Sequence, residues 1–402
     1  MSSGPRTRGR SLAAGLVLVG LAGACLTGVS LTATSGSAVA ETLPVAEVSD
    51  GTAVMAAAAA AGAGAAVNDE LADAAERAAR AAAVVATTAL PTLKAEVKAA
   101  DPVTTIPRPA LPPWSGWVSG AAGSEAEDGS FAAWRGKPLG VVAVWCDTSA
   151  EAQRDLTAVD KYAGFDGEMD VAVGALVRGE TWEQAAAGAY VDRWTTAMRT
   201  LKAKRGGKGT TYVRIGHEYN GDWMAWGVNS KNLAAYKAGY RLYASIVRKE
   251  FPQAKLTWSP NGGNHTDVSI EQQWPGDDVV DVIGPDMYDG YPSVTTQAIW
   301  DRELVRWLAP GSPQGLAAWQ QFASSKGKPL GLPEWGTQGG DHPVFIKGMH
   351  DFIAQHAAAK GSQSVAGKFV YDCYFNAETK FKILNGSYPQ AGQMYTSLTW
   401  GS

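Results

Sequence analysis

The stretch "TYVRIGHE" at residues 211–218 is followed by "NLAAYKAGYRLYASIVRKEF" at 232–251 and by "AKLTWSP" at 254–260. The first and third segments are short and largely apolar, as buried strands are, whereas the second has the length of a helix. A strand, a helix and a second strand in this order indicate a βαβ unit in a parallel sheet. This unit is the repeat from which we predict the fold.

The same alternation continues on both sides, over residues 114–402. Eight segments are strand candidates: 116–122, 140–147, 170–177, 211–218, 254–260, 279–288, 329–335 and 368–375. Helical runs such as 181–205 separate most of them. Eight repeats in about 250 residues or slightly more are typical of an α/β fold of the (β/α)8 TIM-barrel type. A doubly wound open sheet is the alternative, but no glycine-rich dinucleotide motif follows an early strand.

Two other regions precede this domain. Residues 1–40 have a basic start, an apolar middle and small residues at Ala38–Ala40, which predicts a signal peptide. Residues 41–113 are rich in alanine and proline, with a helix candidate at 68–86 and a stiff segment at 101–113. We interpret them as a stalk, partly helical or disordered. The expected product is secreted, with no membrane span in the mature protein, and is associated with the cell wall or surface if the stalk holds it there.

The amino-acid composition limits the kinds of binding partner that we expect. The 402 residues carry a net charge of −4, which gives no electrostatic case for nucleic acid. Fifteen tryptophans and thirteen tyrosines are a high count. Some must lie in the core, but tryptophans near loops often form flat apolar platforms for sugar rings. Only Cys146 and Cys373 remain after cleavage of a signal peptide, so a disulfide and two free thiols both stay open. We expect a monomer without cofactor or metal.

In a TIM barrel the chemistry collects at the carboxyl ends of the strands. There the fourth and seventh strand candidates carry Glu218 and Glu334. Strand alternation puts Arg214 on the same side as Glu218, facing the barrel axis. Two neighbouring carboxyls are what glycoside hydrolysis needs, because one protonates the leaving oxygen while the other attacks the anomeric carbon or activates water. The alternative is that both glutamates are structural and paired with cations such as Arg214.

Three motifs in this order resemble glycoside hydrolase family 26: "RIGHEYNGDWMAWG" at 214–227, "DMYD" at 286–289 and "GLPEWG" at 331–336. The resemblance implies a TIM barrel and a retaining double displacement, with Glu218 as acid/base and Glu334 as nucleophile. Their carboxyl groups should then lie about 5–5.5 Å apart.

The resemblance also implies roles for neighbouring residues. His217 and Tyr288 would orient the carboxyls, with Tyr288 donating a hydrogen bond to Glu334. Trp223 would form the floor of a sugar subsite, and Asp286 would hold a sugar hydroxyl or a partner side chain.

Other residues near strand ends are further candidates. Asn261, Arg214, Trp145 and Trp258 are candidate substrate-binding residues. Trp182 and Trp226 are also near strand ends, and each of the tryptophans has a core role as its alternative.

Two positions depart from the family pattern. Tyr219 stands where mannan-degrading members usually have methionine, and Trp335 stands where they usually have phenylalanine. Because both residues adjoin a catalytic carboxyl, they put the substrate in more doubt than the mechanism. β-1,4-Mannan is the first expectation, while mixed-linkage β-glucan, β-1,3-xylan and an exopolysaccharide remain alternatives.

Two other function classes compete. A metal-dependent hydrolase would need His217, His265 and His342 to converge, yet the chain has no H-x-H or H-E-x-x-H pair. A carbohydrate-binding surface protein would have lost catalysis, which retention of both glutamates argues against. The run Asp277, Asp278 and Asp281 is either a calcium site or, more commonly, a solvated loop.

Overall fold

The computed structural model describes residues 105–107, 110–290 and 292–402. The predicted signal peptide, the helix candidate at 68–86 and most of the predicted stalk lie outside these residues. Within the described part of the chain, no helix combines the length and apolar character needed to cross a membrane.

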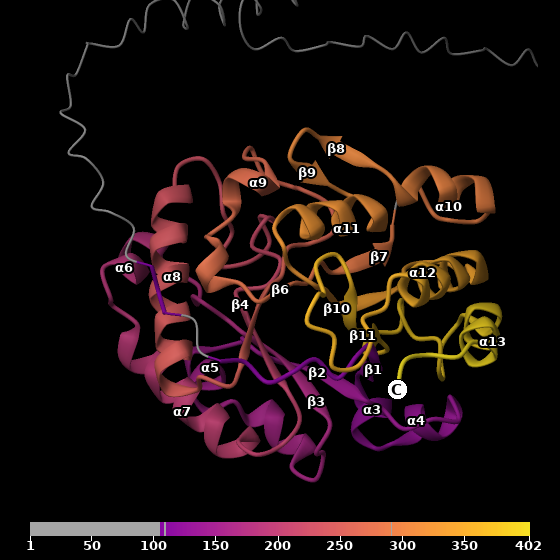
Figure 1. The fold of residues 1–402 in the computed structure, drawn as a ribbon, viewed down its shortest axis with the longest axis horizontal. Helices are drawn as coiled ribbons and strands as arrows, with labels where there is room; N and C mark the ends of the chain where they lie inside the picture. The colour runs from indigo at the N-terminus through magenta and orange to yellow at the C-terminus, as the bar shows by residue number, and fades with distance from the viewer. Residues whose placement is uncertain (1–104, 108–109, 291) are drawn as a thin grey trace, which may run out of the picture. The chain divides into compact units, whose positions relative to one another are not determined.

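The described residues form a closed barrel of eight parallel strands surrounded by helices, as predicted (Figure 1). In chain order the barrel strands are β1 (Val118–Ala122), β2 (Val141–Cys146), β3 (Glu168–Val173), β4 (Thr211–Ile215), β5 (Lys255–Trp258), β6 (Val282–Ile283) with its continuation β7 (Met287–Asp289), β10 (Leu330–Thr337) and β11 (Phe369–Phe375). Closure comes from β1, which pairs in parallel with both β2 and β11. Both β6 and β7 pair with β10, so together they make the sixth barrel strand.

The helices and one hairpin account for the rest of the regular structure. In chain order the helices are α3 (Ser124–Glu127), α4 (Ser130–Trp134), α5 (Ala150–Asp155), η1 (Thr157–Tyr162), α6 (Trp182–Ala186), α7 (Val191–Arg205), α8 (Leu233–Glu250), α9 (Ile270–Gln273), η2 (Asp277–Val279), α10 (Gln297–Leu304), α11 (Leu316–Ser325), α12 (Pro343–Gln355) and α13 (Pro389–Ser397). The antiparallel hairpin consists of β8 (Trp307–Ala309) and β9 (Ser312–Pro313).

The helical run predicted at 181–205 is two helices rather than one. Helix α6 starts at a capping box, in which Thr181 and Gln184 satisfy each other's backbone amides. It ends after one turn because Gly188 adopts a φ of 89°, which turns the chain before α7 begins.

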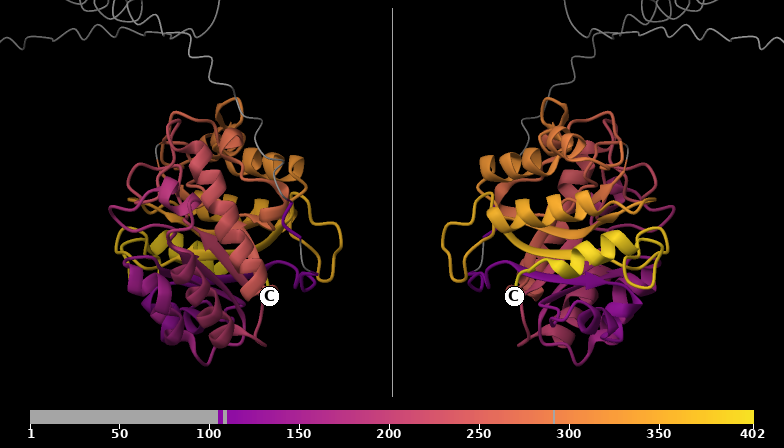
Figure 2. Two further views of the ribbon diagram at one scale, coloured as in Figure 1. Left: turned by 90° about the vertical axis from the view of Figure 1, so that its left-hand side faces the viewer. Right: turned by 90° about the vertical axis from the view of Figure 1, so that its right-hand side faces the viewer.

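Helix α8 shows how the outer layer packs. Tyr236, Tyr240, Tyr243 and Val247 are buried on it at spacings of three and four, which places them on one face. Tyr243 stacks on Trp194 of α7, with ring centroids 4.3 Å apart. Figure 2 shows α7 and α8 side by side against the barrel.

Inside the barrel, the side chains change character from one end to the other. Near the amino ends of the strands, small and aromatic residues such as Ala143, Val282 and Tyr371 form a cluster, with Tyr212 stacked on Tyr371 at 4.2 Å. One layer higher, towards the carboxyl ends, the interior carries the charged side chains of Arg214 and Asp170. The barrel therefore supports its polar site on a packed floor.

The segment before β1 packs against the lower end of the barrel. The ring of Trp114 covers the ammonium group of Lys255 at 4.0 Å, and the Ser115 hydroxyl donates to Glu168 at 2.6 Å. Further upstream, Ile106 contacts the core and its amide donates to Asp278 at 2.8 Å.

Candidate active site

Glu218 lies in a tight turn after β4, not on the strand itself. The strand ends at Ile215, and both Gly216 and Glu218 have positive φ values, 57° and 49°. A glutamate in this left-handed region costs of order 1–3 kcal/mol and persists only where its surroundings impose it. Here the Glu218 amide donates to the Ser259 carbonyl at 2.7 Å. The turn, rather than the predicted strand alternation, brings Glu218 to the site.

Two side chains hold the Glu218 carboxyl. Asn261 Nδ2 donates to Oε1 at 2.6 Å, and Trp223 Nε1 donates to Oε2 at 2.8 Å. Burial raises the pKa of Glu218, the nearby charge of Glu334 raises it further, and the hydrogen bonds from Asn261 and Trp223 oppose the shift only partly. Glu218 therefore keeps its proton to higher pH than an ordinary glutamate, as a proton donor must.

Glu334, on β10, has the opposite environment. Its Oε1 accepts hydrogen bonds from Trp145 Nε1 at 2.9 Å and from Arg214 Nη1 at 3.0 Å, while its Oε2 accepts from the Tyr288 hydroxyl at 2.8 Å. The last contact is the one that the family resemblance implied. Burial would raise the pKa of Glu334, but the charge and hydrogen bond of Arg214, together with the Tyr288 hydroxyl, lower it below its usual range. Glu334 is thus held as an anion.

Arg214 joins the carboxylates of the barrel interior. It is fully buried, and it pairs with Asp170 through Nε and with Asp286 at 3.4 Å through Nη1. Burial and the charge of Glu334 raise the pKa of Asp286 well above its ordinary value. Because no part of Arg214 is exposed, its position supports a role in holding Glu334 rather than the predicted direct contact with substrate.

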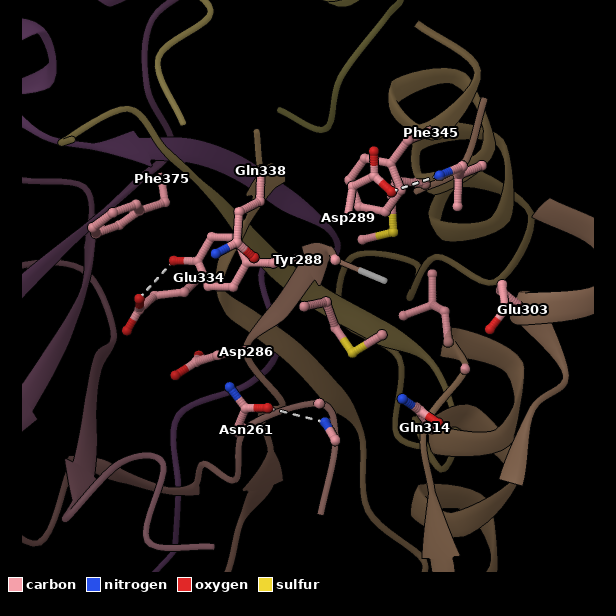
Figure 3. Close-up of a pocket in the computed structure, with 18 of the residues that line it drawn as sticks. Asn261, Asp286, Tyr288, Asp289, Glu303, Gln314, Glu334, Gln338, Phe345 and Phe375 are labelled. Carbon is pink, nitrogen blue, oxygen red and sulfur yellow. Dashed lines mark hydrogen bonds between the residues drawn. The ribbon is translucent and has the colours of Figure 1, made fainter. Parts of the chain in front are cut away.

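Both glutamates line one cavity of about 770 Å³ at the carboxyl ends of the strands. Figure 3 shows Glu334 in this cavity, beside Tyr288. Asn261, Asp286 and Tyr288 line the same cavity. Trp223 stands at its rim with half of its surface exposed, so that one face is free to contact a ligand. Six of the sequence-predicted substrate-binding residues therefore line this cavity or donate to a candidate catalytic carboxyl, and both catalytic candidates line it.

The fold brings His217 close to Asp147, an acidic residue for which no role was predicted. His217 Nδ1 is buried without a hydrogen-bond partner among the described residues, 3.7 Å from Asp147 Oδ2. Burial, then the charge of Arg214, lowers the pKa of His217 to about 3, so the ring is neutral. Burial raises the pKa of Asp147 to about 6. The position of Asp147 at the end of the second strand was the available signal.

The tryptophans divide between site and core. Trp145 and Trp223 each donate to a candidate catalytic carboxyl. Trp258 is fully buried and donates to the Tyr236 hydroxyl of α8. Its position in β5 directs the ring towards the helices, which does not support the predicted contact with sugar.

Two further tryptophans also serve the core. Trp182 is buried and donates to the carbonyl of Trp226, and Trp226 donates to the carbonyl of His217. Both therefore hold the loop that carries Glu218 instead of presenting a ring face to the cavity.

The two departures from the family pattern also face away from the cavity. Tyr219 is fully buried against Tyr236 and Trp258, with ring centroids 5.2 and 5.3 Å away. Trp335 is fully buried and donates to Asp372 at 2.9 Å. Neither lines the cavity, because each follows its glutamate and points to the other side of the chain. Their identity therefore bears on core packing and does not set the shape of the cavity.

No group of three or more histidine, cysteine or acidic side chains suited to a metal occurs among the described residues. In the acidic run, Asp278 pairs with Arg241 and Asp281 with Arg248, so these carboxylates neutralise arginines. His342 pairs with Asp289, away from His217. The two cysteines are free and buried, on strands that flank β1.

Several residues that line the cavity were not predicted from the sequence. Phe375, Phe381 and Lys380 line one wall, where Phe381 packs on Tyr288 with ring centroids 4.6 Å apart. Gln314 lines another, in a loop with no regular periodicity. Only the closed barrel places these loops beside Glu334.

Known proteins resemble this chain both in sequence and in fold. Residues 174–312 match the model of glycosyl hydrolase family 26. A mannan endo-1,4-beta-mannosidase from Bifidobacterium adolescentis is 33% identical over 128 residues, which are 31% of this chain and 12% of that protein. The match therefore spans a small part of the relative's length.

Solved structures share the fold. They include a modular endo-beta-1,4-mannanase from Cellulomonas fimi, with 18% identity, a TM-score of 0.51 and 71% of each chain covered. GH26C from Muricauda sp. MAR_2010_75 has 15% identity, a TM-score of 0.50, and coverage of 70% of this chain and 85% of the other. The resemblance that the motifs predicted is confirmed in part of the chain: residues 174–312, which include Glu218 and Tyr288, match the model of glycosyl hydrolase family 26, whereas Glu334 lies outside the matched segment.

Proposed function

We propose that this protein is a secreted, retaining glycoside hydrolase that cleaves a β-linked polysaccharide, with β-1,4-mannan as the first substrate to test. One observation carries the proposal. Two carboxyls line the same cavity, and their surroundings move their pKa values apart, upward for Glu218 and downward for Glu334. Opposite shifts in one site are typical of an acid and an anion that share a reaction.

The chemistry follows from these states. Glu334 attacks the anomeric carbon and forms a glycosyl ester, while Glu218 gives its proton to the departing glycosidic oxygen. Glu218, now ionised, takes a proton from a water molecule, whose oxygen attacks the anomeric carbon and releases Glu334. Arg214 and Tyr288 hold Glu334 in place between the two steps through the hydrogen bonds described above. The two carboxyls are expected about 5–5.5 Å apart for this mechanism.

The choice of mannan rests on similarity to the Bifidobacterium mannosidase, together with the family match. Mixed-linkage β-glucan, β-1,3-xylan and an exopolysaccharide are the alternatives for the same site. Secretion, a monomeric state and attachment at the cell surface are part of the proposal and rest on the sequence of residues 1–113 and on composition.

The test is a reducing-sugar assay on purified mannans, β-glucans, xylans and polymers of the producing organism. Wild-type protein should release sugar from one class, with mannan expected, and Glu334→Gln should release none. Glu218→Ala should lose most activity on polysaccharide but keep activity on aryl glycosides with good leaving groups, which need little protonation. If Glu334→Gln cleaved polysaccharide at the wild-type rate, the proposal would be wrong.

A further inference from the structure

The hairpin β8–β9 belongs to the connection that follows the sixth barrel strand, between α10 and α11 (Figure 1). Connections from a strand to the next helix lie at the carboxyl face of a TIM barrel, which is the face that carries the active site. The hairpin is therefore an insertion on the same face as Glu218 and Glu334.

The hairpin exposes an apolar stretch. Among the described residues four large hydrophobic side chains are exposed, and three of them are Val305, Trp307 and Leu308, at 55%, 39% and 48%. The fourth, Trp223, stands at the rim of the cavity. Apolar side chains gathered on an exposed surface mark a contact site for another molecule.

This stretch is continuous with the wall of the cavity. Glu303 and Leu304 line the cavity immediately before it, and Gln314 and Gly315 line it immediately after. Trp307 pairs across the hairpin with Pro313, the neighbour of Gln314 in sequence. Residues of the cavity wall therefore flank the hairpin on both sides, and Trp307 lies opposite a direct neighbour of one of them.

The hairpin is also held in place. The amides of Gln314 and Gly315 donate to the Arg306 carbonyl at 3.0 and 2.8 Å, which closes its base. The Glu271 amide of α9 donates to the Gly311 carbonyl at 2.9 Å, which fixes its tip. A platform fixed in this way loses little conformational entropy when a ligand binds.

We propose that Trp307 forms a distal subsite for sugar units of the polysaccharide chain, beyond the cavity that holds the cleaved bond. The inference rests on the proposed function and extends it. An indole offers a flat apolar face that matches the face of a pyranose ring. Units bound there lie far from the reacting bond, so they add affinity for a long polymer and nothing for a ligand that ends inside the cavity.

The experiment compares Trp307→Ala with Leu308→Ala, a matched control. Leu308 is the next residue and is also exposed, but it lacks the flat aromatic ring that can stack on a sugar, so it separates the effect of the indole from that of exposed apolar surface. The KM of each variant is measured on the polysaccharide that the wild type cleaves and on a short oligosaccharide of the same sugar. For Trp307→Ala the ratio of polymer KM to oligosaccharide KM should rise about tenfold, the change that a loss of 1.4 kcal/mol of binding gives. Leu308→Ala should keep the wild-type ratio.

Three results would overturn the inference. The first is an unchanged ratio of polymer KM to oligosaccharide KM for Trp307→Ala, and the second is an equal rise of this ratio for both variants. The third is self-association of the wild-type protein in sedimentation that Trp307→Ala abolishes, because the hairpin would then be an interface between copies of the chain. If the wild type cleaves no polysaccharide, the proposed function fails instead. The subsite is then tested without turnover by affinity electrophoresis in gels that contain polysaccharide. Two proteins are compared, Glu334→Gln and Glu334→Gln/Trp307→Ala, and equal retardation of both would contradict the proposed subsite.

Discussion

Two glutamates of the same chemical type differ here because of the atoms that surround them. Glu334 receives three donors, one of them the charged Arg214, whereas Glu218 receives only the neutral donors Asn261 and Trp223 and lies near a second negative charge. A hydrogen bond to a carboxylate stabilises its charged form and lowers its pKa. Each donor thus has a predictable effect on the pH profile.

Tyr288→Phe removes one donor to Glu334 and should raise the pKa of Glu334, because its anion loses stabilisation. The acidic limb of the kcat/KM profile should move to higher pH. Hydrogen bonds to charged groups are worth about 1.5–3 kcal/mol, so kcat/KM at the optimum should fall about tenfold to a hundredfold. A profile measured from pH 3 to 9 decides this, and an unmoved acidic limb would contradict it.

Asn261→Ala should change the basic limb of the kcat/KM profile. Asn261 Nδ2 donates to the Glu218 carboxyl and favours its ionised form, so its loss should raise the pKa of Glu218 still further. The basic limb of the same profile should therefore move to higher pH while the acidic limb stays. Asn264→Ala is the control, since Asn264 donates to the Val268 carbonyl and does not line the cavity. A basic limb that moved to lower pH in Asn261→Ala would refute this reading of the contact.

Asp147 should set the tautomer of His217. Above about pH 6 Asp147 is ionised, and a proton on Nδ1 of the neutral ring then faces the carboxylate, which frees Nε2 to accept a hydrogen bond. Below that pH the neutral carboxylic acid becomes a donor, and the proton moves to Nε2. Nitrogen-15 shifts of the His217 ring from pH 4.5 to 8 report the change. The same tautomer throughout, or a change that persists in Asp147→Ala, would contradict the prediction.

At the scale of elements, β5 carries a charge at the closed end of the barrel. Lys255 is its first residue, and burial lowers the pKa of Lys255 to about 8. Between pH 8 and about 10.4, the unfolded value, the unfolded chain binds more protons than the folded one. The free energy of unfolding contributed by Lys255 therefore rises with pH in this window, and it is constant at its lowest value below the window, where both states are protonated.

Lys255→Met isolates that contribution. The difference in unfolding free energy between wild type and variant, from urea titrations at several pH values, should shift in favour of the wild type by at most about 3 kcal/mol from pH 8 to 10.4. Other groups that titrate in this range are common to both proteins and cancel. A difference independent of pH would show that Lys255 titrates normally in the folded protein.

The elements also show how far the sequence alone leads. Apolar runs between helical segments were enough to predict eight strands and a closed barrel, because a strand covered on both faces must be apolar throughout. The bend at Gly216–Glu218 was not predictable, since a glutamate with a positive φ leaves no pattern in the residues themselves. Trp258 and Trp335 lie near predicted strand ends, yet both rings are buried and neither lines the cavity. Whether a ring at a strand end faces the axis or the helices depends on the register of the strand.

At the scale of the whole molecule, barrel closure brings together side chains that are far apart in the chain. Arg214 and Glu334 are 120 positions apart, yet they share a hydrogen bond because β4 and β10 both border the same interior. The motifs predicted this meeting of strand ends. The loops that wall the cavity, with Gln314 and Phe381, lacked a pattern of their own, and the hairpin beside them was not predicted.

In the proposed reaction, Glu334 forms a covalent bond to the sugar while Glu218 supplies the proton. A fluorinated glycoside with a good leaving group slows the second step and traps the intermediate, which peptide mass spectrometry then locates. We expect one added glycosyl group on the peptide that contains Glu334, and none in Glu334→Gln. Label on any other carboxyl, or direct release of the inverted sugar with no label at all, would contradict it.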